Sequence, residues 1–360
     1  MTEGYRPPTA DSRPSTILIT GGCGFLGTNL VKYLSGKGYR VRILDNLSTP
    51  SREFASQQSS VSGPPSPRTV DTGLSTVDLV VGDVRDDEAA KKGTEGVDAV
   101  VHLAAHTSVV ESLEKPREAW DINVNGTLNL LEACRLNKVD RFIFASSNAV
   151  VGEQEPPIDE TKIPRPLSPY GASKLAGEAL CSTYYHSFGL KTVSLRFSNL
   201  YGPYSEHKPS VIARYIDWAR KGEPLIIYGD GNQTRDFVHV GDICQAIHLA
   251  LTADSRPATS DTQPTQQTPR TPGTQSTQET QQTQVWGEVF QIASGVETSI
   301  NQLTELIKAM ADSKLSIVHK PKRKGEIERN YSDITKARKL LGFEPRITLR
   351  EGLGELWQVH

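Results

Sequence analysis

The stretch TILITGGCGFLG at residues 16–27 decides the fold of this chain. Its first half is a short apolar run typical of a buried strand, and a glycine-rich turn follows directly. An amphipathic pattern through Leu30, Val31 and Leu34 then predicts a helix that starts within this turn. A strand, a glycine-rich turn and a helix in this order are typical of a βα unit that binds a dinucleotide.

The glycines give the turn its chemistry. Gly21, Gly24 and Gly27 have no side chain, so a pyrophosphate can approach the backbone N–H groups at the start of the helix. The helix dipole favours negative charge at the same point. We therefore expect the phosphates of a dinucleotide here, in contact with Gly21, Gly24, Phe25, Leu26 and Gly27.

An acidic residue indicates which dinucleotide binds. Asp45 lies eighteen residues after Gly27, at the end of the next predicted strand, 39–45. A carboxylate at this point accepts hydrogen bonds from the adenosine ribose and repels the 2′-phosphate of NADP. No arginine follows it directly, so the sequence favours NAD as the cofactor, with Asp45 and Asn46 among its contacts.

Short apolar runs alternate with helical patterns through the first 200 residues. The predicted strands lie near 16–20, 39–45, 77–82, 98–104, 141–146 and 191–197. Such alternation favours an α/β fold, a doubly wound parallel Rossmann sheet with helices on both faces. We assign residues 16–200 to this NAD-binding domain.

The pattern loosens beyond residue 200. Apolar runs lie at 225–228, 237–240 and 289–292, and helical patterns follow at 299–311, 332–341 and 349–357. We interpret residues 201–360 as mainly a smaller C-terminal α/β lobe that binds the substrate. Such a lobe would close over a cleft at the carboxyl ends of the core strands.

Three segments do not fit a compact fold. Residues 1–15 are polar and contain prolines, residues 51–76 are rich in Ser, Pro and Gln, and residues 255–284 form a Thr/Gln/Pro tract. These segments contain too few apolar side chains to offset the entropy of ordering. We therefore predict a disordered tail and two disordered loops.

Composition and charge exclude several classes of protein. A net charge of −2 over 360 residues offers no basic surface for nucleic acid or for an anionic membrane. No window approaches eighteen apolar residues, and the N-terminus lacks the apolar core of a signal peptide. The four cysteines are widely spaced without a zinc-type pattern, so we expect reduced thiols, no metal and a cytoplasmic location.

A tyrosine and a lysine point to proton transfer. Tyr170 and Lys174 are four residues apart in the stretch SPYGASK (168–174), which reads as the start of a helix. One helical turn therefore places both side chains on the same face. A phenol with a pKa of about 10 is a poor base at neutral pH, but a nearby ammonium favours the phenolate. Together with the positively charged nicotinamide ring of the cofactor, the ammonium is expected to lower that pKa by about three units.

Ten motifs follow one another along the chain: TGGCGFLG (20–27), LDNLS (44–48), GDVRD (82–86), HLAA (102–105), NVNGT (123–127), SSNAVVG (146–152), SPYGASK (168–174), LRFSNLYGP (195–203), GDGNQTRDFVHVGD (229–242) and RKGE (323–326). In this order they resemble the extended short-chain dehydrogenase/reductase family, and within it the NAD-dependent nucleotide-sugar epimerases and dehydratases. The greatest resemblance is to the UDP-glucose 4-epimerases. The likeness covers the chain apart from the tail and the two low-complexity segments.

The resemblance implies a catalytic set of Ser147, Tyr170 and Lys174. The serine hydroxyl would bridge the 4-hydroxyl of the sugar and the tyrosine, and the lysine would also bond the nicotinamide ribose. Asp83 and Val84 match contacts to the adenine ring. The remaining cofactor contacts that the resemblance implies are Leu103, Ala104 and Ala105.

The resemblance also implies an anchor for a nucleotide-diphosphate sugar. Arg235 and Arg323 would clamp the diphosphate or its ribose, because a guanidinium pairs with phosphate in a fixed, bidentate geometry. Asn199 matches an asparagine that bonds a substrate phosphate, and Tyr228 would pack on the base. The implied reaction is inversion at carbon 4 of the sugar through a transient 4-keto intermediate, in a homodimer.

Several alternatives stay open. Dehydratases of this family follow the catalytic residue with an Asp-Glu pair, and here those positions hold Asn148 and Ala149. The usual aromatic residue before Gly152 is Val151, which leaves UDP-glucuronate and N-acetylated sugars as alternatives to UDP-glucose. A non-catalytic NAD-binding scaffold is a further alternative, against which the intact catalytic set argues.

Overall fold

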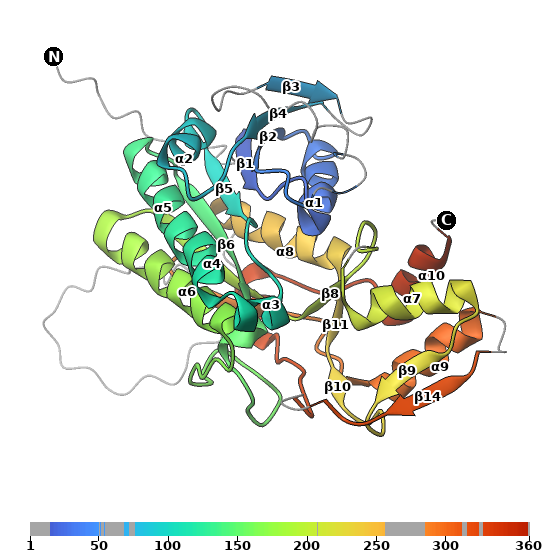
Figure 1. Cartoon of the computed structure of the whole chain (residues 1–360). Helices are drawn as coiled ribbons and strands as arrows, with labels where there is room; N and C mark the ends of the chain where they lie inside the picture. Colours follow the sequence, from blue (N-terminus) through green and yellow to red (C-terminus); the bar gives the residue numbers. More distant parts are fainter. Residues whose placement is uncertain are drawn as a thin grey trace, which may run out of the picture.

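The structure, a computed structural model, describes residues 15–49, 51, 54, 68–71, 76–206, 208–255, 285–311, 315–323 and 327–358. One large sheet forms its centre (Figure 1). The strands of this sheet are β1 (Thr16–Thr20), β2 (Arg40–Asp45), β3 (Arg68–Asp71), β4 (Thr76–Val81), β5 (Ala99–His102), β6 (Arg141–Ser147), β7 (Lys191–Phe197) and β12 (Val289–Ile292).

The order of the strands confirms the doubly wound fold. Across the sheet they run β12-β7-β6-β5-β1-β2-β4-β3, and every pairing from β12 to β4 is parallel. Within the described part of this sheet, only the edge strand β3 is antiparallel to its neighbour. The chain leaves β1 toward β2 on one side and later returns to β5 on the other. The carboxyl ends of β1 and β5 therefore border the crevice at which such sheets bind ligands.

Helices cover both faces of the sheet (Figure 1). One face carries α1 (Phe25–Ser35) and α8 (Val240–Leu251), and the other carries α2 (Asp87–Thr94), α5 (Gly126–Leu136) and α6 (Pro169–Phe188). Strand alternation sorts the core between them. Ile17 and Ile19 of β1 join the cluster beneath α1 and α8, whereas Leu18 joins the cluster beneath α2 and α5.

Short helical segments connect these layers. They are α3 (Val109–Glu114), α4 (Pro116–Trp120), the π-helical turn η2 (Asp121–Asn125), the 3₁₀ turns η3 (Asn148–Val150) and η4 (Ala253–Ser255), and the π-helical turn η5 (Ala337–Leu341). The helix predicted at 332–341 is therefore shorter than expected and ends in a π turn. No helix among the described residues is long and apolar enough to cross a membrane.

A second, smaller core lies in the C-terminal part of the chain. Three two-stranded pairs contribute to this part, namely β8 (Asn199–Tyr201) with β11 (Phe237–His239), β10 (Thr234–Arg235) with β13 (Thr298–Ser299), and β9 (Leu225–Tyr228) with β14 (Ile317–Lys320). The helices are α7 (Val211–Lys221), α9 (Ile300–Met310) and α10 (Leu349–Gln358). Their apolar faces meet in one cluster through residues such as Ile216, Ile307 and Leu353.

The prediction of disorder across residues 51–76 is wrong in part. Phe54 is fully buried in the main core, and the Ser51 hydroxyl lies 2.7 Å from that of Thr28. Residues 68–71 form β3, because backbone pairing with β4 needs no apolar run. A composition average hides such single anchors. The other residues of this segment, up to 75, lie outside the described residues.

Two boundaries also differ from expectation. The run 289–292 forms β12 in the main sheet, beside β7, and not in the C-terminal lobe. Phe290 and Ile292 are fully buried there, as expected for a strand covered on both faces. Ser15 belongs to the ordered fold, since its hydroxyl donates to Asp98. Residues 1–14 and 256–284, which carry the other predictions of disorder, lie outside the described residues.

Candidate active site

Helix α6 carries the predicted acid–base pair. Its start is fixed by Ser168, whose hydroxyl accepts a hydrogen bond from Gly171 N at 3.1 Å, and by Pro169 at the first helical position. Its end is fixed by Gly189, which adopts a left-handed conformation with φ +73°. The helix thus begins one residue before Tyr170, so the cap and the proline fix the position of the phenol relative to the sheet.

The structure brings Ser147, Tyr170 and Lys174 together. Ser147 is the last residue of β6, and its hydroxyl lies within hydrogen-bonding reach of the Tyr170 phenol. The Lys174 ammonium is almost fully buried, with Nζ 6.0 Å from the centre of the Tyr170 ring and 5.0 Å from that of Phe144. A hydroxyl, a phenol and an ammonium therefore meet at the carboxyl end of the central sheet.

The expectation that Lys174 lowers the pKa of the phenol is not met by the protein alone. Burial raises the pKa of Tyr170, against a smaller lowering by the bond to Ser147. Burial also lowers the pKa of Lys174 to about 8. Desolvation is the largest cause of both shifts.

The glycine-rich turn between β1 and α1 is built by close backbone contacts. Gly21 has φ +67°, and a Cβ there would lie 2.8 Å from Ala104 N. A Cβ on Gly27 would lie 2.3 Å from Gly21 O. A Cβ on Gly24 would meet no atom of the protein closer than Gly21 O at 3.5 Å, so the fold itself leaves space at this position.

That space fits a pyrophosphate. Helix α1 begins without a side-chain cap and has no acidic residue in its first turn, so its first N–H groups face the space beside Gly24. The turn also packs against the loop after β5, where Ala104 N donates to the Thr20 hydroxyl at 3.2 Å. The predicted cofactor contacts of the turn and of this loop therefore lie next to each other. Phe25 and Leu26 follow Gly24 in the turn, and Leu103 and Ala105 flank Ala104 in the loop.

The predicted ribose and adenine contacts lie at the ends of β2 and β4. Asp45 accepts from Cys23 N at 2.9 Å and from Leu47 N at 2.7 Å, which ties the acid to the glycine-rich turn. Asp83 accepts from Asn46 and from Arg85, and the guanidinium lowers the pKa of Asp83 to about 2. The Asp83 carboxylate is thus ionised and held by protein donors.

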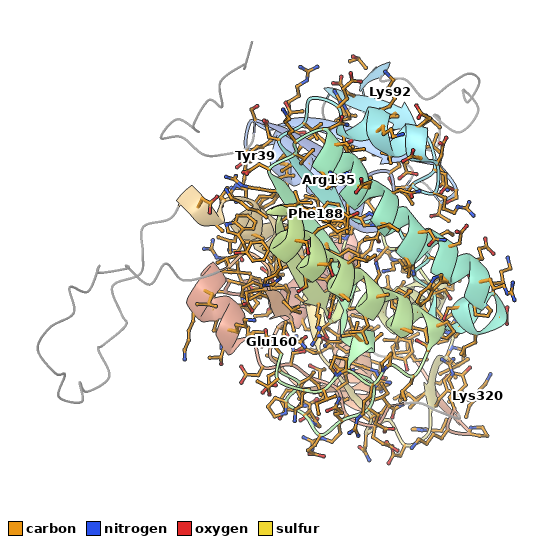
Figure 2. All side chains as sticks on the ribbon, turned by 90° about the vertical axis from the view of Figure 1, so that its left-hand side faces the viewer. Tyr39, Lys92, Arg135, Glu160, Phe188 and Lys320 are labelled. Atoms are coloured by element: carbon orange, nitrogen blue, oxygen red, sulfur yellow. The ribbon has the colours of Figure 1, made fainter. Side chains whose placement is uncertain are left out.

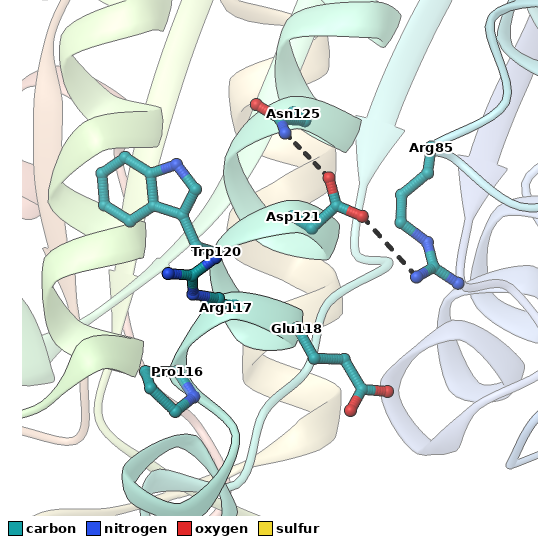
Figure 3. Close-up of a pocket in the computed structure, with 7 residues that line it drawn as sticks. All are labelled: Arg85, Pro116, Arg117, Glu118, Trp120, Asp121 and Asn125. Carbon is teal, nitrogen blue, oxygen red and sulfur yellow. Dashed lines mark hydrogen bonds and ion pairs between the residues drawn. The ribbon is translucent and has the colours of Figure 1, made fainter.

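Val84 is almost fully buried, and its carbonyl accepts from Asn129 at 3.2 Å. A shallow pocket lies just outside this end of the sheet, between α4, η2 and the loop after β4 (Figure 3). In it Asp121 accepts from Asn125 at 2.8 Å and lies 3.7 Å from Arg85 (Figure 3). None of the predicted catalytic residues lines this pocket, so it lies apart from the predicted catalytic set and beside the predicted adenine contacts.

A buried polar chain links the cofactor turn to α6, and sequence reasoning missed it. Its members are Thr20, His102, Thr127, Asn123 and Ser173. The Thr127 hydroxyl donates to Asn123 O at 2.6 Å, so it accepts from His102 Nε2 at 3.0 Å, and His102 Nδ1 accepts from Thr20. Burial lowers the pKa of His102 to about 3, so the ring stays neutral. The motif NVNGT marks part of this chain.

Asn123 completes the connection from within the π-helical turn η2. Its side chain accepts from His106 N at 2.7 Å and donates to Ser173 Oγ at 2.9 Å. Ser173 in turn donates to Tyr170 O at 2.7 Å. π turns inside helices are frequent at functional sites. Here the turn lets one asparagine hold the loop after β5 against the first turn of α6.

The predicted substrate residues lie in the C-terminal part of the chain, beyond β7. Asn199 is exposed on β8, two residues beyond the end of β7. The Arg323 guanidinium lies 3.7 Å from the centre of the Tyr228 ring, so these two residues meet as a stacked pair. Arg235 donates to the carbonyls of Thr234 and Ile327, the latter beyond Arg323 on the same segment.

A further cation reaches the cofactor turn from this side. Lys208, in the loop between β8 and α7, has Nζ 4.8 Å from the centre of the Phe25 ring. Burial lowers the pKa of Lys208. Phe25 is the first residue of α1, so this ammonium lies beside the predicted phosphate site. No sequence motif marks Lys208. Among the described residues no cluster of acidic, histidine and cysteine side chains could hold a metal ion.

The model of the NAD dependent epimerase/dehydratase family matches residues 17–261 of this chain. The chain belongs to that family. It is therefore an enzyme of the NAD-dependent nucleotide-sugar epimerase and dehydratase class. The matched residues include the turn at Gly21 to Gly27, the predicted catalytic set and Arg235, and the match extends into the tract at 255–284.

Two relatives in the family differ in the sugar that they are named for. A putative UDP-glucose 4-epimerase of Methanocaldococcus jannaschii is 36% identical over 343 residues, covering 94% of this chain and 95% of its own. A UDP-glucuronate 4-epimerase of Thermodesulfobacterium geofontis is 33% identical over 262 residues, covering 72% and 71%. The family is thus shown, whereas the relatives do not agree on one substrate.

Solved structures of the family agree with the fold. UDP-glucose 4-epimerase of Thermotoga maritima, solved with UDP-glucose, has a TM-score of 0.77 at 31% identity, covering 94% of this chain and 96% of its own. The enzyme of Thermus thermophilus, solved with NAD, has a TM-score of 0.75 at 29% identity, covering 96% and 100%. UDP-N-acetylglucosamine 4-epimerase of Methanobrevibacter ruminantium has a TM-score of 0.78 at 29% identity, covering 96% and 98%.

Proposed function

We propose that this chain is a nucleotide-sugar 4-epimerase that interconverts UDP-glucose and UDP-galactose. The observation that carries the proposal is the meeting of Ser147, Tyr170 and Lys174 at the end of the sheet, with Asn148 and Ala149 directly after the serine. This set can move a proton at the sugar 4-hydroxyl, but it lacks the carboxylates that an elimination of water needs.

Each residue of the catalytic set has a separate role in this reaction. Tyr170, once ionised, accepts the proton of the 4-hydroxyl and later returns it. Ser147 holds the sugar oxygen and the phenol in one hydrogen-bonded group. Lys174 provides the positive charge that favours the phenolate. The glycine-rich turn and Asp45 would hold NAD, which would supply a reversible hydride acceptor for carbon 4. The reaction would have no net redox change, because the hydride would return to the opposite face of carbon 4 while Tyr170 returns the proton to the oxygen.

The C-terminal side supports a nucleotide-diphosphate anchor. Tyr228 is surrounded by the cations Arg323, Lys320 and Arg214, which all lower its pKa. An aromatic ring in a positive field suits a base followed by two phosphates. Asn199 is exposed on β8. Such an anchor would keep the nucleotide in place while the keto sugar turns over within the cleft.

Asn148 does not substitute for the dehydratase acid. Its amide donates to Ser332 Oγ at 2.8 Å, and the residue is buried. Ala149 N is bonded to Ser147 Oγ at 3.2 Å, and its side chain has no proton to give. Val151 is fully buried beside Val150 and Ile158, so it offers the sugar no polar contact. A carboxylate at carbon 6, as in glucuronate, would find no polar partner in Val151, so UDP-glucose is our first choice over UDP-glucuronate. The product panel decides between UDP-glucose and an N-acetylated sugar.

A product panel tests this proposal. Purified protein without added cofactor is incubated with UDP-glucose, UDP-glucuronate, UDP-N-acetylglucosamine and dTDP-glucose, and products are followed by NMR. We expect the 4-epimer of UDP-glucose to form fastest, because the cofactor is regenerated in every cycle. Faster epimerisation of the glucuronate or N-acetylated sugar would correct the substrate. A 4-keto-6-deoxy product would replace epimerase by dehydratase.

We also propose a homodimer through the helical layer of α4, α5 and α6. Four large apolar side chains are exposed on it, namely Trp120, Leu128, Leu136 and Phe188. Figure 2 shows Arg135 and Phe188 next to each other on adjacent helices, and the guanidinium lies 5.4 Å from the ring centre. Exposed apolar groups gathered on one layer are typical of a subunit interface.

Light scattering after gel filtration tests the dimer. We expect the wild-type protein to have twice the mass of the chain, and Leu128→Glu to have the mass of a single chain, because a buried, unpaired carboxylate opposes association. Val318→Glu, a matched change at an exposed apolar residue of β14, should remain a dimer. A wild-type monomer, or an unchanged mass for Leu128→Glu, would contradict the proposal.

We also propose a cytoplasmic location for the protein. Its four cysteines are free and buried, which agrees with a reducing compartment.

A further inference from the structure

A buried ion pair lies behind the catalytic lysine. Glu178 follows Lys174 by one helical turn on α6, and Arg196 on β7 donates to both of its oxygens at 2.8 Å. The exposed fractions of the two side chains are about 6% and 4%. A buried bidentate pair of this kind is rigid, because no water can replace either partner.

The same carboxylate also holds the strand that carries the catalytic serine. The Ser146 hydroxyl donates to Glu178 Oε1, and Ser146 precedes Ser147 at the end of β6. Ser146 and Arg196 are register partners in the β6–β7 pairing, so both donors reach Glu178 from one row of the sheet. Glu178 therefore ties the ends of two neighbouring strands to one turn of α6.

The helix and the sheet approach closely at this point. Gly177 lies between Lys174 and Glu178, and a Cβ on it would be 2.3 Å from Phe144 Cζ. The Lys174 ammonium packs on the same Phe144 ring, at 5.0 Å from its centre. Lys174 and Gly177 of α6 thus both lie against Phe144 of β6, and Glu178 of the same helix contacts Ser146 of the same strand.

We propose that Glu178, clamped by Arg196 and Ser146, is a positioning residue that fixes Ser147 against Tyr170 and keeps Lys174 charged. The inference rests on the proposed proton-transfer function of this set. Two consequences follow. The serine and the tyrosine come from different elements, so their contact depends on the register between β6 and α6. The charge of Lys174 depends on the carboxylate one turn away.

Charged and titratable groups from each neighbouring element bear on Lys174. On α6 they are Tyr170, Glu178 and Cys181, on β5 it is His102, and on β7 it is Arg196 through its pair with Glu178. Burial lowers the pKa of Lys174 to about 8, and Glu178 acts in the opposite direction. Removing the carboxylate therefore lowers that pKa further, and the lysine loses its charge at a lower pH.

Three variants separate positioning from stability. Glu178→Gln should lower kcat about tenfold or more. It should also shift the alkaline limb of the pH–kcat profile to lower pH, by about one pH unit. The double variant E178L/R196M removes both charges and should recover most of the melting temperature lost in Glu178→Gln, because no buried charge is left unpaired. The kcat of the double variant should stay below that of the wild type, and its alkaline limb should stay at lower pH. Glu178→Asp keeps the charge with a shorter reach, so it should restore the limb more than the rate.

A matched control lies on the same strand. Arg141, at the opposite end of β6, is also buried and pairs with Asp254 at 3.3 Å. Arg141→Met should lower the melting temperature but leave the pH profile in place. If the profiles of Glu178→Gln and E178L/R196M coincide with that of the wild type, Glu178 is merely structural and the inference is wrong.

A substrate-independent measurement keeps the inference separate from the proposed function. The titration of Lys174 can be followed by NMR of protein labelled with carbon-13 lysine, with the signal assigned by its absence from Lys174→Met. We expect a lower midpoint in Glu178→Gln than in the wild type. If the wild type turns over no nucleotide sugar while this midpoint shifts, the proposed function fails and the link between Glu178 and Lys174 stands. An unchanged midpoint overturns the link itself.

Discussion

Tyr170→Phe is expected to abolish turnover, with a fall in kcat of about a thousandfold or more, while the fold and the bound NAD are kept. The change removes one oxygen atom, and that oxygen bonds only Ser147 among the contacts described for it. The helix cap at Ser168 and the backbone bond from Tyr170 N to Ser112 Oγ remain. General acid–base groups contribute about a hundredfold to ten-thousandfold, and here one group serves both directions of proton transfer.

Tyr184→Phe is the matched control for this variant. Tyr184 lies on the same helix and is buried, and its hydroxyl donates to Glu132 at 2.9 Å. Removing that oxygen should cost about 1 kcal/mol of stability and leave kcat unchanged. Initial rates, NAD content after purification and melting curves are measured for both variants. Turnover by Tyr170→Phe at the wild-type rate would dismiss Tyr170 as the base.

The pKa values of the catalytic set show where sequence reasoning stops. The spacing of Tyr170 and Lys174 predicts correctly that both lie on one face of α6. It cannot predict that burial raises the pKa of the phenol, since burial depends on β6, β5 and the loop above them. Lys174, with a pKa of about 8, is largely charged at neutral pH, yet burial still raises the pKa of Tyr170 in the protein alone. The positively charged nicotinamide ring of bound NAD would supply the further charge that favours the phenolate.

The fold was predictable wherever a local pattern determines it. β1, α1 and β2 follow from the alternation around the glycine-rich turn, and β6 and β7 from continuous apolar runs. β3 was not, because its pairing with β4 is made by backbone groups that carry no sequence signal. β12 was misassigned to the C-terminal lobe, since a strand of four residues does not reveal which sheet it will join.

The same division holds for the site. Residues in motifs, such as Gly21, Asp45 and Tyr170, can be predicted because their chemistry is local, and their roles toward cofactor and substrate stay predictions. Lys208 and Arg196 were missed because their roles depend on elements distant in sequence. The roles of Asn199 and Arg235 toward a substrate stay predictions. Sequence therefore predicts the groups that react more readily than the groups that hold them in place.

Two glycines of the same turn should fail in different ways when substituted. Gly24 adopts an ordinary extended conformation, φ −79° and ψ −175°, and a Cβ on it would meet only Gly21 O, at 3.5 Å. Gly24→Val should therefore leave the melting temperature close to that of the wild type. Its side chain would occupy the space beside the first N–H groups of α1, so we expect NAD affinity to fall by about a hundredfold, or about 2.8 kcal/mol.

Gly27→Ala should instead damage the fold. A Cβ there would lie 2.3 Å from Gly21 O and 2.5 Å from Gly22 Cα, which are backbone atoms that cannot turn aside. We expect a loss of about 2 to 3 kcal/mol in unfolding free energy, together with loss of NAD. Gly354→Val on α10, where a Cβ meets nothing within 4 Å, is the control for a glycine away from the site and should keep its NAD. Titration calorimetry with NAD and urea unfolding distinguish the cases. Should Gly24→Val bind NAD as the wild type does, the pyrophosphate does not lie at this turn, and the assignment of the cofactor site would have to move.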